Sequence, residues 1–301
     1  MKIIDPKSDL GFKTILVDQP DIFIDVVNSM IPLPKPVVDV TYISAELLPE
    51  INGIKNTIID AYCIDTEKRH FMVEMQVAQQ SNFIQRTLLN ASKVYSRQIF
   101  QGGKFNTLQP FYSINLLNHI MDAKSDLWHH EYKLRHHKFN KRSLDDLTLH
   151  FFELPKWQKF NKFDINNPLD RWLQFFTNPN FYTMISLEER QMLDKIYNAV
   201  DLLDTKNYTI EQLRGYDQFI DNIMIRETDL DEAEKRGIQK GIKKGIKKGI
   251  VQGIEKGREL ASEEMLLIMS DIKEKNLTIE QIAEKYNTSQ ERVFWFKSLI
   301  S

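Results

Sequence analysis

Three polar side chains, those of Asp60, Glu74 and Gln76, interrupt a stretch whose other residues have the β-branched and aromatic character of strands. Residues 55–77 therefore predict a β-hairpin, with a polar Thr-Glu-Lys-Arg run as its turn. A turn centred on Glu67 places Asp60 directly opposite Glu74. Directly opposed residues of an antiparallel pair have Cβ atoms about 4.5–5.5 Å apart. We therefore expect the two carboxylates to share one small region.

Two carboxylates at this separation repel each other unless a positive charge lies between them. Mg²⁺ is held by one or two carboxylates together with water and substrate phosphate. Gln76 projects from the same strand face as Glu74, because side chains alternate with a period of two. The simpler interpretation, acidic residues that are only solvated on an exposed strand, stays open at this point. The opposite strand face predicts a core and carries Ile59, Ala61, Cys63, Val73, Met75 and Val77.

The elements around this hairpin follow from hydrophobic periodicity and from capping and breaking residues. A nearly continuous apolar run after the hairpin predicts a strand that is buried on both faces. A long helix separates the two, and a strand–helix–strand unit implies a parallel crossover. The order α, β, β, β, α, β predicts a mixed sheet with helices against it. In residue numbers, the elements are helices 9–17 and 21–30, a strand 37–44, the hairpin, a helix 81–101 and a strand 110–118.

Two stripes run along the predicted helix 81–101. One is apolar and is expected to pack on the sheet, and it consists of Ile84, Leu88, Ala91, Tyr95 and Ile99. The other is polar, lies on a different side, and consists of Arg86, Asn90, Lys93 and Arg97. By itself the polar stripe indicates a solvated helix face. Beside a carboxylate site, the same stripe could neutralise a phosphate backbone.

This order of elements resembles the PD-(D/E)XK nuclease family transposases, also called Rpn-type recombination-promoting nucleases, over about the first half of the chain. The resemblance implies an α/β, restriction-endonuclease-like αβββαβ core, DNA as the substrate and Mg²⁺ as the cofactor. Asp60 then corresponds to the strand acid and Glu74 to the second acid, and Gln76 stands where other nucleases of this fold carry lysine. The residues that carry the resemblance are Asp9 to Lys13 (DxxFK), Asp60, Glu74 to Gln76 (ExQ), Arg86, Tyr95 and Gln98.

The mechanism that this resemblance implies is hydrolysis of a phosphodiester bond. Asp60 and Glu74 bind one Mg²⁺ or two, and the ion activates a water that attacks the phosphate. Gln76 orients that water without supplying charge. Arg86 or Lys93 stabilises the phosphate, and Asp9 supports the site from the first helix. Two other interpretations stay open: a catalytically silent relative that binds DNA or itself, and a nuclease that acts on RNA.

Composition narrows the setting of such a protein. The chain has 301 residues, a formal net charge of -2 and a single cysteine, so it forms no intrachain disulfide. That net charge gives no global attraction to nucleic acid, so any such binding must be local. No apolar run approaches the roughly 18 residues of a membrane span, and the first residues do not form a signal peptide. The sequence predicts a cytoplasmic protein that does not bind membranes.

Beyond the nuclease-like domain, expected over residues 1–155, the chain predicts a mainly helical C-terminal extension. Two further strands are expected at 127–137 and 147–153, with five histidines on the surface of that region. A helical extension follows at 156–228, then a glycine repeat at 229–260 and a small helix-turn-helix-like segment at 261–301. That last segment either contacts DNA or is a helical hairpin used for packing.

The repeat carries a glycine at every fourth position from Gly237 to Gly257, and isoleucine follows five of the six. Each glycine inside a helix costs up to about 1 kcal/mol relative to alanine. One interpretation is an extended helix whose small residues let a partner helix approach, which makes the protein a homodimer through the repeat and the C-terminal helices. The other is a loosely ordered basic tether. In either case the lysines could touch DNA without sequence preference.

Overall fold

The computed structural model describes residues 2–43, 46–47, 57–58, 60–78, 82–99, 102–139, 143–185 and 193–300. The chain divides into two compact units, Met1–Ile223 and Met224–Ser301. Ile59 and both ends of the predicted helix 81–101 lie outside the described residues.

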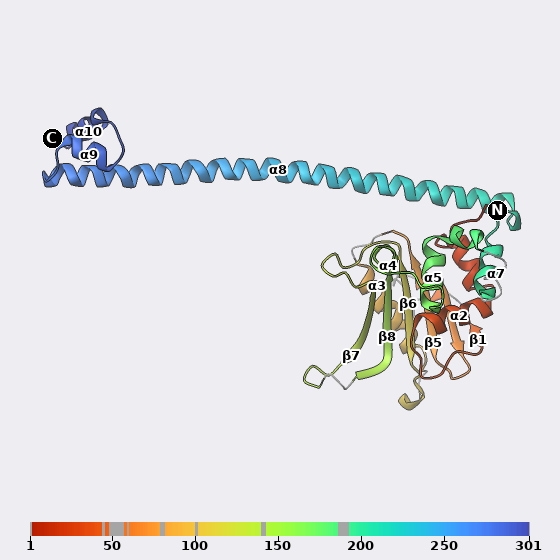
Figure 1. Ribbon diagram of the computed structural model, residues 1–301. Coiled ribbons are helices and arrows are strands. Elements are labelled where there is room, and N and C mark those ends of the chain that lie inside the picture. Colours follow the sequence, from red (N-terminus) through yellow and green to blue (C-terminus); the bar gives the residue numbers. More distant parts are fainter. Residues whose placement is uncertain are drawn as a thin grey trace. The chain divides into compact units, whose positions relative to one another are not determined.

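A six-stranded mixed sheet forms the centre of the first unit (Figure 1), with the strand order β1-β4-β5-β6-β8-β7. The neighbours β5, β6 and β8 run parallel, and the other adjacent pairs of this sheet are antiparallel. A separate pair joins β2 (Glu46–Leu47) to β3 (Thr57–Ile58). The strands of the main sheet are β1 (Val40–Tyr42), β4 (Ala61–Asp65), β5 (His70–Gln76), β6 (Phe111–Leu117), β7 (His129–Arg135) and β8 (Ser143–Glu153).

Helices cover both faces of this sheet, which confirms the predicted α/β class and the restriction-endonuclease-like αβββαβ order. One face packs against a large apolar core that includes Phe12, Phe71 and Trp172. The core therefore continues across residue 155, where the sequence predicted a domain boundary. The elements that contribute to it are α1 (Asp9–Leu16), α2 (Pro20–Met30), α4 (Leu154–Phe160), α5 (Pro168–Thr177), η2 (Pro179–Met184) and α7 (Asp194–Leu202).

The hairpin has the predicted register. Ala61 pairs with Val73, Tyr62 with Met72 and Ile64 with His70, as a turn centred on Glu67 requires. Lys68, within that turn, has a φ of 65°, the left-handed conformation that a tight turn demands of one residue. The parallel pairing of β5 with β6 confirms the crossover through the intervening helix.

The helix of that crossover, α3 (Phe83–Ser96), covers the second face of the sheet with a different side from the one predicted. Its buried residues are Phe83, Thr87, Asn90, Ala91 and Val94. Of the expected apolar stripe, Ala91 is buried, whereas Ile84 and Leu88 are 39% and 47% exposed. The reason lies beneath the helix, because the sheet presents the polar Glu74 there and the helix turns its own polar residues toward it.

The histidine-rich region forms β7 and β8, as predicted, but the expectation that all its histidines are surface residues is wrong. His150 is buried, and its ring stacks on that of His129 with 3.1 Å between Nδ1 and Nε2. Burial is the main reason that the pKa of His150 falls to about 4. The two rings therefore pack in their neutral forms at neutral pH.

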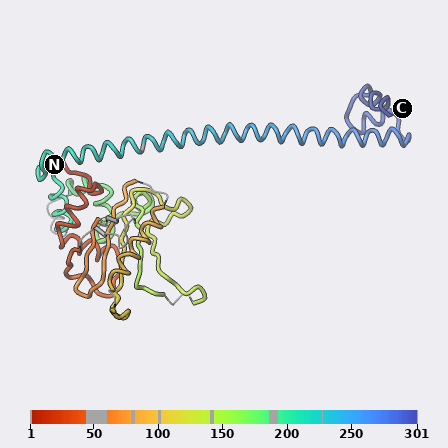
Figure 2. The backbone as a smooth tube through the Cα atoms, turned by 180° about the vertical axis from the view of Figure 1, so that it is seen from behind, coloured from red at the N-terminus to blue at the C-terminus, as the bar shows by residue number. Residues whose placement is uncertain are grey.

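The second unit consists of the later part of α8 (Ile210–Glu274) with α9 (Ile279–Lys285) and α10 (Gln290–Ser298). Figure 2 shows α9 and α10 folded back on the end of α8, where Ile268, Ile282 and Val293 share a small core. Thr278 forms a capping box with Gln281 at the start of α9, and Asn287 makes the turn with a φ of 45°. The whole glycine repeat is helical. None of the described helices is long and apolar enough to cross a bilayer.

The observed orientation of α3 predicts unequal effects of two truncations. Val94→Ala should reduce the free energy of unfolding by about 2 kcal/mol, because it removes two methyl groups from the core between α3 and the sheet. Leu88→Ala, on the exposed side, should reduce it by less than about 1 kcal/mol. Urea unfolding followed by circular dichroism measures both. The reverse ranking would support the face predicted from the sequence.

Candidate metal site

Glu74 is a buried acid on a central strand of the sheet. It lies on β5, between β4 and β6, on the face that α3 covers, and it is 5% exposed. Its Oε1 accepts a long hydrogen bond of 3.4 Å from Asn90 Nδ2 on α3. Its Oε2 is buried and has no hydrogen-bond partner among the described residues. A buried polar atom without a partner is costly, so this oxygen indicates either a bound proton or an absent ligand.

Asp60 lies immediately before β4, and its carboxylate is tied to the strand of Glu74. Asp60 Oδ2 accepts a hydrogen bond of 2.9 Å from the backbone N–H of Met75. This bond fixes Asp60 beside the next residue along β5, in agreement with the pairing predicted from the turn. Burial raises the pKa of Asp60, and the negative charge of Asp9 adds to that effect, whereas the Met75 hydrogen bond opposes it.

The electrostatics of the two acids are coupled. Burial, together with the smaller effect of the negative charge of Asp60, raises the pKa of Glu74 to about 7, while Arg86 and the Asn90 hydrogen bond act in the opposite direction. A carboxyl with a pKa near neutrality is partly protonated in a cell. A divalent cation would replace that proton and relieve the repulsion between the acids.

Gln76 and Arg86 form a second part of the site. Arg86 Nη2 on α3 donates a hydrogen bond of 2.5 Å to Gln76 Oε1, and Gln76 Nε2 donates one of 2.6 Å to the carbonyl of Ala78. The guanidinium also lies over the ring of Phe83, 5.1 Å from its centroid. The Gln76 amide therefore positions the Arg86 guanidinium. The sequence predicted that Gln76 orients a water, and it did not predict this contact.

Asp9 and Lys93 are not brought to the same point. Asp9 pairs with Lys13 at 3.0 Å on the exposed side of α1, although both charges lie near enough to Asp60 to influence its pKa. Lys93 is partly exposed on α3. Among the described residues, no group of three His, Cys, Asp or Glu side chains is placed to hold a metal ion. The expected convergence of Asp9 with the two strand acids stays a prediction.

Asn115 is a polar neighbour that sequence reasoning missed. It lies on β6 directly beside Glu74 in the parallel ladder, and it is fully buried. Its Nδ2 donates to Ser113 Oγ and to the carbonyl of His150, both at 2.9 Å, which leaves Oδ1 as a buried oxygen without a partner. The sequence did contain a signal for this residue, because Asn115 is a polar side chain within the nearly continuous apolar run 111–117.

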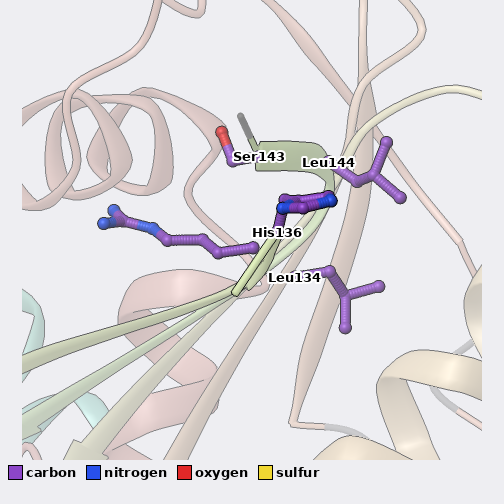
Figure 3. Close-up of a pocket in the computed structure, with 5 residues that line it drawn as sticks. Leu134, His136, Ser143 and Leu144 are labelled. Carbon is purple, nitrogen blue, oxygen red and sulfur yellow. The ribbon is translucent and has the colours of Figure 1, made fainter. Parts of the chain in front are cut away.

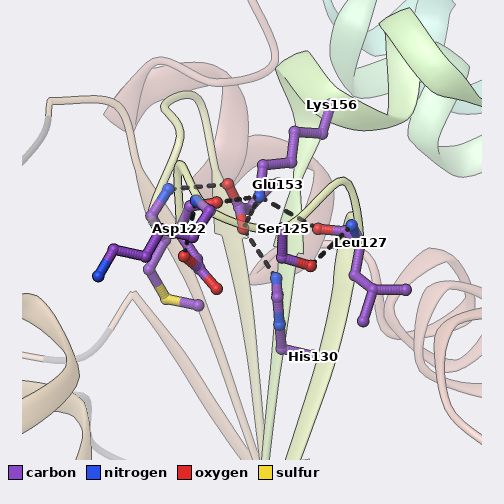
Figure 4. Close-up of polar contacts among 8 residues, drawn as sticks. Asp122, Ser125, Leu127, His130, Glu153 and Lys156 are labelled. Atoms are coloured by element: carbon purple, nitrogen blue, oxygen red, sulfur yellow. Dashed lines mark hydrogen bonds and ion pairs between the residues drawn. The ribbon is translucent and has the colours of Figure 1, made fainter.

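A second charged cluster lies where β8 ends, and it differs from the first in being fully paired (Figure 4). Glu153 accepts hydrogen bonds from His130 Nε2 at 2.8 Å, from Lys156 Nζ at 2.9 Å and from the backbone of Met121 at 2.8 Å. Lys156 also donates to the carbonyls of Asp122 and of one further loop residue, Leu127. These contacts fasten the β6–β7 loop to the end of β8, which indicates a structural role.

The hollow shown in Figure 3 is not part of this site. It has a volume of about 400 Å³ and lies at the start of β8, whereas Glu74 lies near the end of the parallel strand β5. The described residues that line it are mostly apolar in surface and include no carboxylate: Leu134, Arg135, His136, Ser143 and Leu144.

Comparisons with known proteins gave one match. A family model described as PD-(D/E)XK nuclease family transposase matches residues 6–225, well over half of the chain. That range contains the two acids, Gln76, Arg86 and Asn115. No curated protein and no solved structure matches the chain.

The raised pKa of Glu74 predicts that Glu74→Gln stabilises the metal-free protein at high pH. The folded state binds the Glu74 proton more tightly than the unfolded state. The contribution of Glu74 to the free energy of unfolding is therefore greatest below a pH of about 4.5 and declines as the pH rises toward 7. Gln mimics the protonated acid and avoids this loss. At pH 8 the variant should be more stable by roughly 3 kcal/mol.

Urea unfolding at pH 5 and pH 8 in the presence of EDTA measures the effect. The difference between variant and wild type should shrink strongly at pH 5. The exposed Asp126→Asn is the matched control and should change stability little at either pH. A Glu74→Gln protein that is less stable than wild type at pH 8 would contradict the assignment of Glu74 as a buried, strained acid.

Proposed function

Because the chain belongs to the PD-(D/E)XK nuclease family transposases, we propose that it is a divalent-metal-dependent endonuclease that hydrolyses DNA, in recombination or transposition. The observation that carries the proposal is the buried Glu74 carboxylate, which has an unpartnered oxygen and a second acid, Asp60, fixed beside its strand. Burying two acids together destabilises a protein unless a ligand offsets the cost. A site of this kind suits a bound cation.

The donor atoms fit Mg²⁺. Asp60 and Glu74 supply carboxylate oxygens, and Asn115 adds a buried neutral amide oxygen next to Glu74. Hard cations of this type prefer oxygen ligands and keep several waters. When bound, such an ion polarises a phosphate and lowers the pKa of a bound water. We assign Asp60 and Glu74 as the metal-binding acids, with Asn115 as the neutral donor beside them.

Arg86 would bind the phosphodiester. Its planar guanidinium matches two phosphate oxygens, and it is exposed on α3, where Gln76 and the Phe83 ring fix its orientation. Lys93 lies two turns further along α3 and adds positive charge in the same direction. Asp9 stays a supporting residue that affects the site through its charge on Asp60.

A second candidate function is that of a catalytically silent relative that binds DNA or itself. It is favoured by the ion pair between Asp9 and Lys13, which engages the carboxylate of Asp9. The place where other nucleases of this fold carry lysine is occupied by Gln76, and its amide is engaged by Arg86. Such a protein would keep the charged surface of α3 and lose only the reaction.

Supercoiled plasmid separates the two candidates. The wild-type protein should nick plasmid with Mg²⁺ and not with EDTA. Asp60→Ala and Glu74→Gln should each reduce the rate at least about 100-fold, because each removes a metal ligand. Asp126→Asn should keep the wild-type rate. Plasmid that is retarded on a gel but stays uncut at every Mg²⁺ and Mn²⁺ concentration would favour the silent relative.

Metal binding can be measured without catalysis. Mn²⁺ should raise the melting temperature of the wild-type protein at pH 8, since a ligand that binds only the folded state stabilises it. The rise should be smaller at pH 6, because a proton on Glu74 competes with the ion. Asn115→Leu, which keeps a similar volume, should reduce the rise, and Asp60→Asn should abolish it. An equal rise in all three proteins would show that the ion binds elsewhere.

A further inference from the structure

Residues 224–263 of α8, which precede the segment that packs against α9 and α10, have no packing partner among the described residues of the second unit. From Met224 to Glu263, every side chain that the structure describes is exposed. Five isoleucines of the repeat are between 52% and 60% exposed: Ile238, Ile242, Ile246, Ile250 and Ile254. Most helical stability in proteins comes from packing of an apolar face, so a helix with such residues in solvent is incomplete by itself.

The glycines of the repeat are not required by close contacts with the described residues of their own chain. An added Cβ at any of the six positions from Gly237 to Gly257 would meet no atom within 4 Å. Their backbone is ordinary helix, and the one described glycine with a positive φ is Gly102. Each glycine nevertheless costs the helix about 1 kcal/mol. What glycine does provide is close approach of another backbone, so the repeat points to a helix from outside the chain.

The charges decide how that helix runs. Residues 228–234 hold four acids and no base, and residues 235–248 hold seven bases and no acid. Two parallel copies in register would place the basic segments against each other, which is repulsive. Two antiparallel copies that cross near Gly237 place the acidic segment of each against the basic segment of the other. Charge complementarity therefore favours a second copy of the same helix in the antiparallel direction.

The small residues are symmetric about the same point. Ala233, Gly237 and Gly241 are spaced by four, so they form one ridge, and Gly237 is at its centre. In an antiparallel pair, Ala233 of one copy faces Gly241 of the other while the two Gly237 residues meet. Ridges spaced by four cross at about −50°, so the contact is centred on this ridge. Ile238 and Ile242 lie beside it, where they can fill the flanking grooves.

We propose that α8 is a docking surface for a second copy of this chain, with the two helices antiparallel and crossing at Gly237. The acidic segment 228–234 of each copy lies beside the basic segment 240–248 of the other. A DNA duplex would account for the lysines, but neither for the exposed isoleucines nor for the glycine spacing. The dimer does not depend on the nuclease activity.

Cross-linking of full-length protein tests both the partner and the direction. The probe is a short bis-maleimide, and wild type is the control, since its only cysteine, Cys63, is buried. Gly237→Cys should cross-link to itself. Leu230 and Lys244 each lie seven residues, about 10 Å of helix, from the crossing, on opposite sides, and almost on the same side of the helix as Gly237. Leu230→Cys and Lys244→Cys should therefore give covalent dimers only when the two proteins are mixed.

A glycine pair provides a measurement that does not depend on thiols. Gly237→Leu should raise the dimer dissociation constant at least about tenfold in analytical ultracentrifugation, because the larger side chain separates the helices. Gly257→Leu, outside the crossing, should leave it unchanged. Both changes favour the helix of the monomer, so misfolding would not explain a loss of dimer.

Three outcomes overturn the proposal. The first is wild-type protein that stays monomeric at its highest soluble concentration, or that dimerises only when duplex DNA is added. The second is self-cross-linking of Leu230→Cys and of Lys244→Cys separately, which would show parallel helices. The third is equal weakening by Gly237→Leu and Gly257→Leu, which would place the contact elsewhere on α8.

Discussion

The first unit depends on one constraint, the burial of an acid on a central strand beneath a helix. Glu74 lies in the middle of the mixed sheet, where solvent cannot screen it, and its pKa is raised mainly for that reason. Neighbouring groups offset part of the cost of burying this acid. Asn90 donates to one of its oxygens, and Asp60 is held to the adjacent backbone. α3 turns a partly polar face to the sheet instead of its most apolar one. One oxygen of Glu74, Oε2, is left without a hydrogen-bond partner among the described residues, and it is there that we propose a metal ion binds.

Comparison with the Glu153 cluster shows why the unpartnered oxygen of Glu74 is informative. Both acids are buried on the same sheet, and both lie near the carboxyl ends of parallel strands. Glu153 has Lys156, His130 and a backbone N–H as partners, so its charge is balanced within the chain. Glu74 has a second acid near it instead of a lysine. Buried charge must be paired. That rule indicates a structural role for Glu153, and it supports the proposed binding site at Glu74.

The second unit presents the opposite problem, because α8 exposes apolar and small residues where the sheet buries polar ones. Its small core with α9 and α10 accounts for the end of the helix, through Ile268 and its neighbours. It does not account for the isoleucines of the repeat. The proposed second copy of the chain would contact these isoleucines and the glycines beside them.

The sequence by itself determined the parts of this protein that depend on local rules. Alternation and a tight turn set the register of the hairpin as far as the pair of Ala61 with Val73, next to Asp60 and Glu74, and Thr278 caps the start of α9. The family was also readable there, because the spacing of its short motifs is a property of the chain. Tertiary structure alone decided which side of α3 faces the sheet, since that choice depends on the polar groups beneath the helix. It also brought Asn115 beside Glu74. These contacts join residues far apart in the chain, and no local periodicity encodes them.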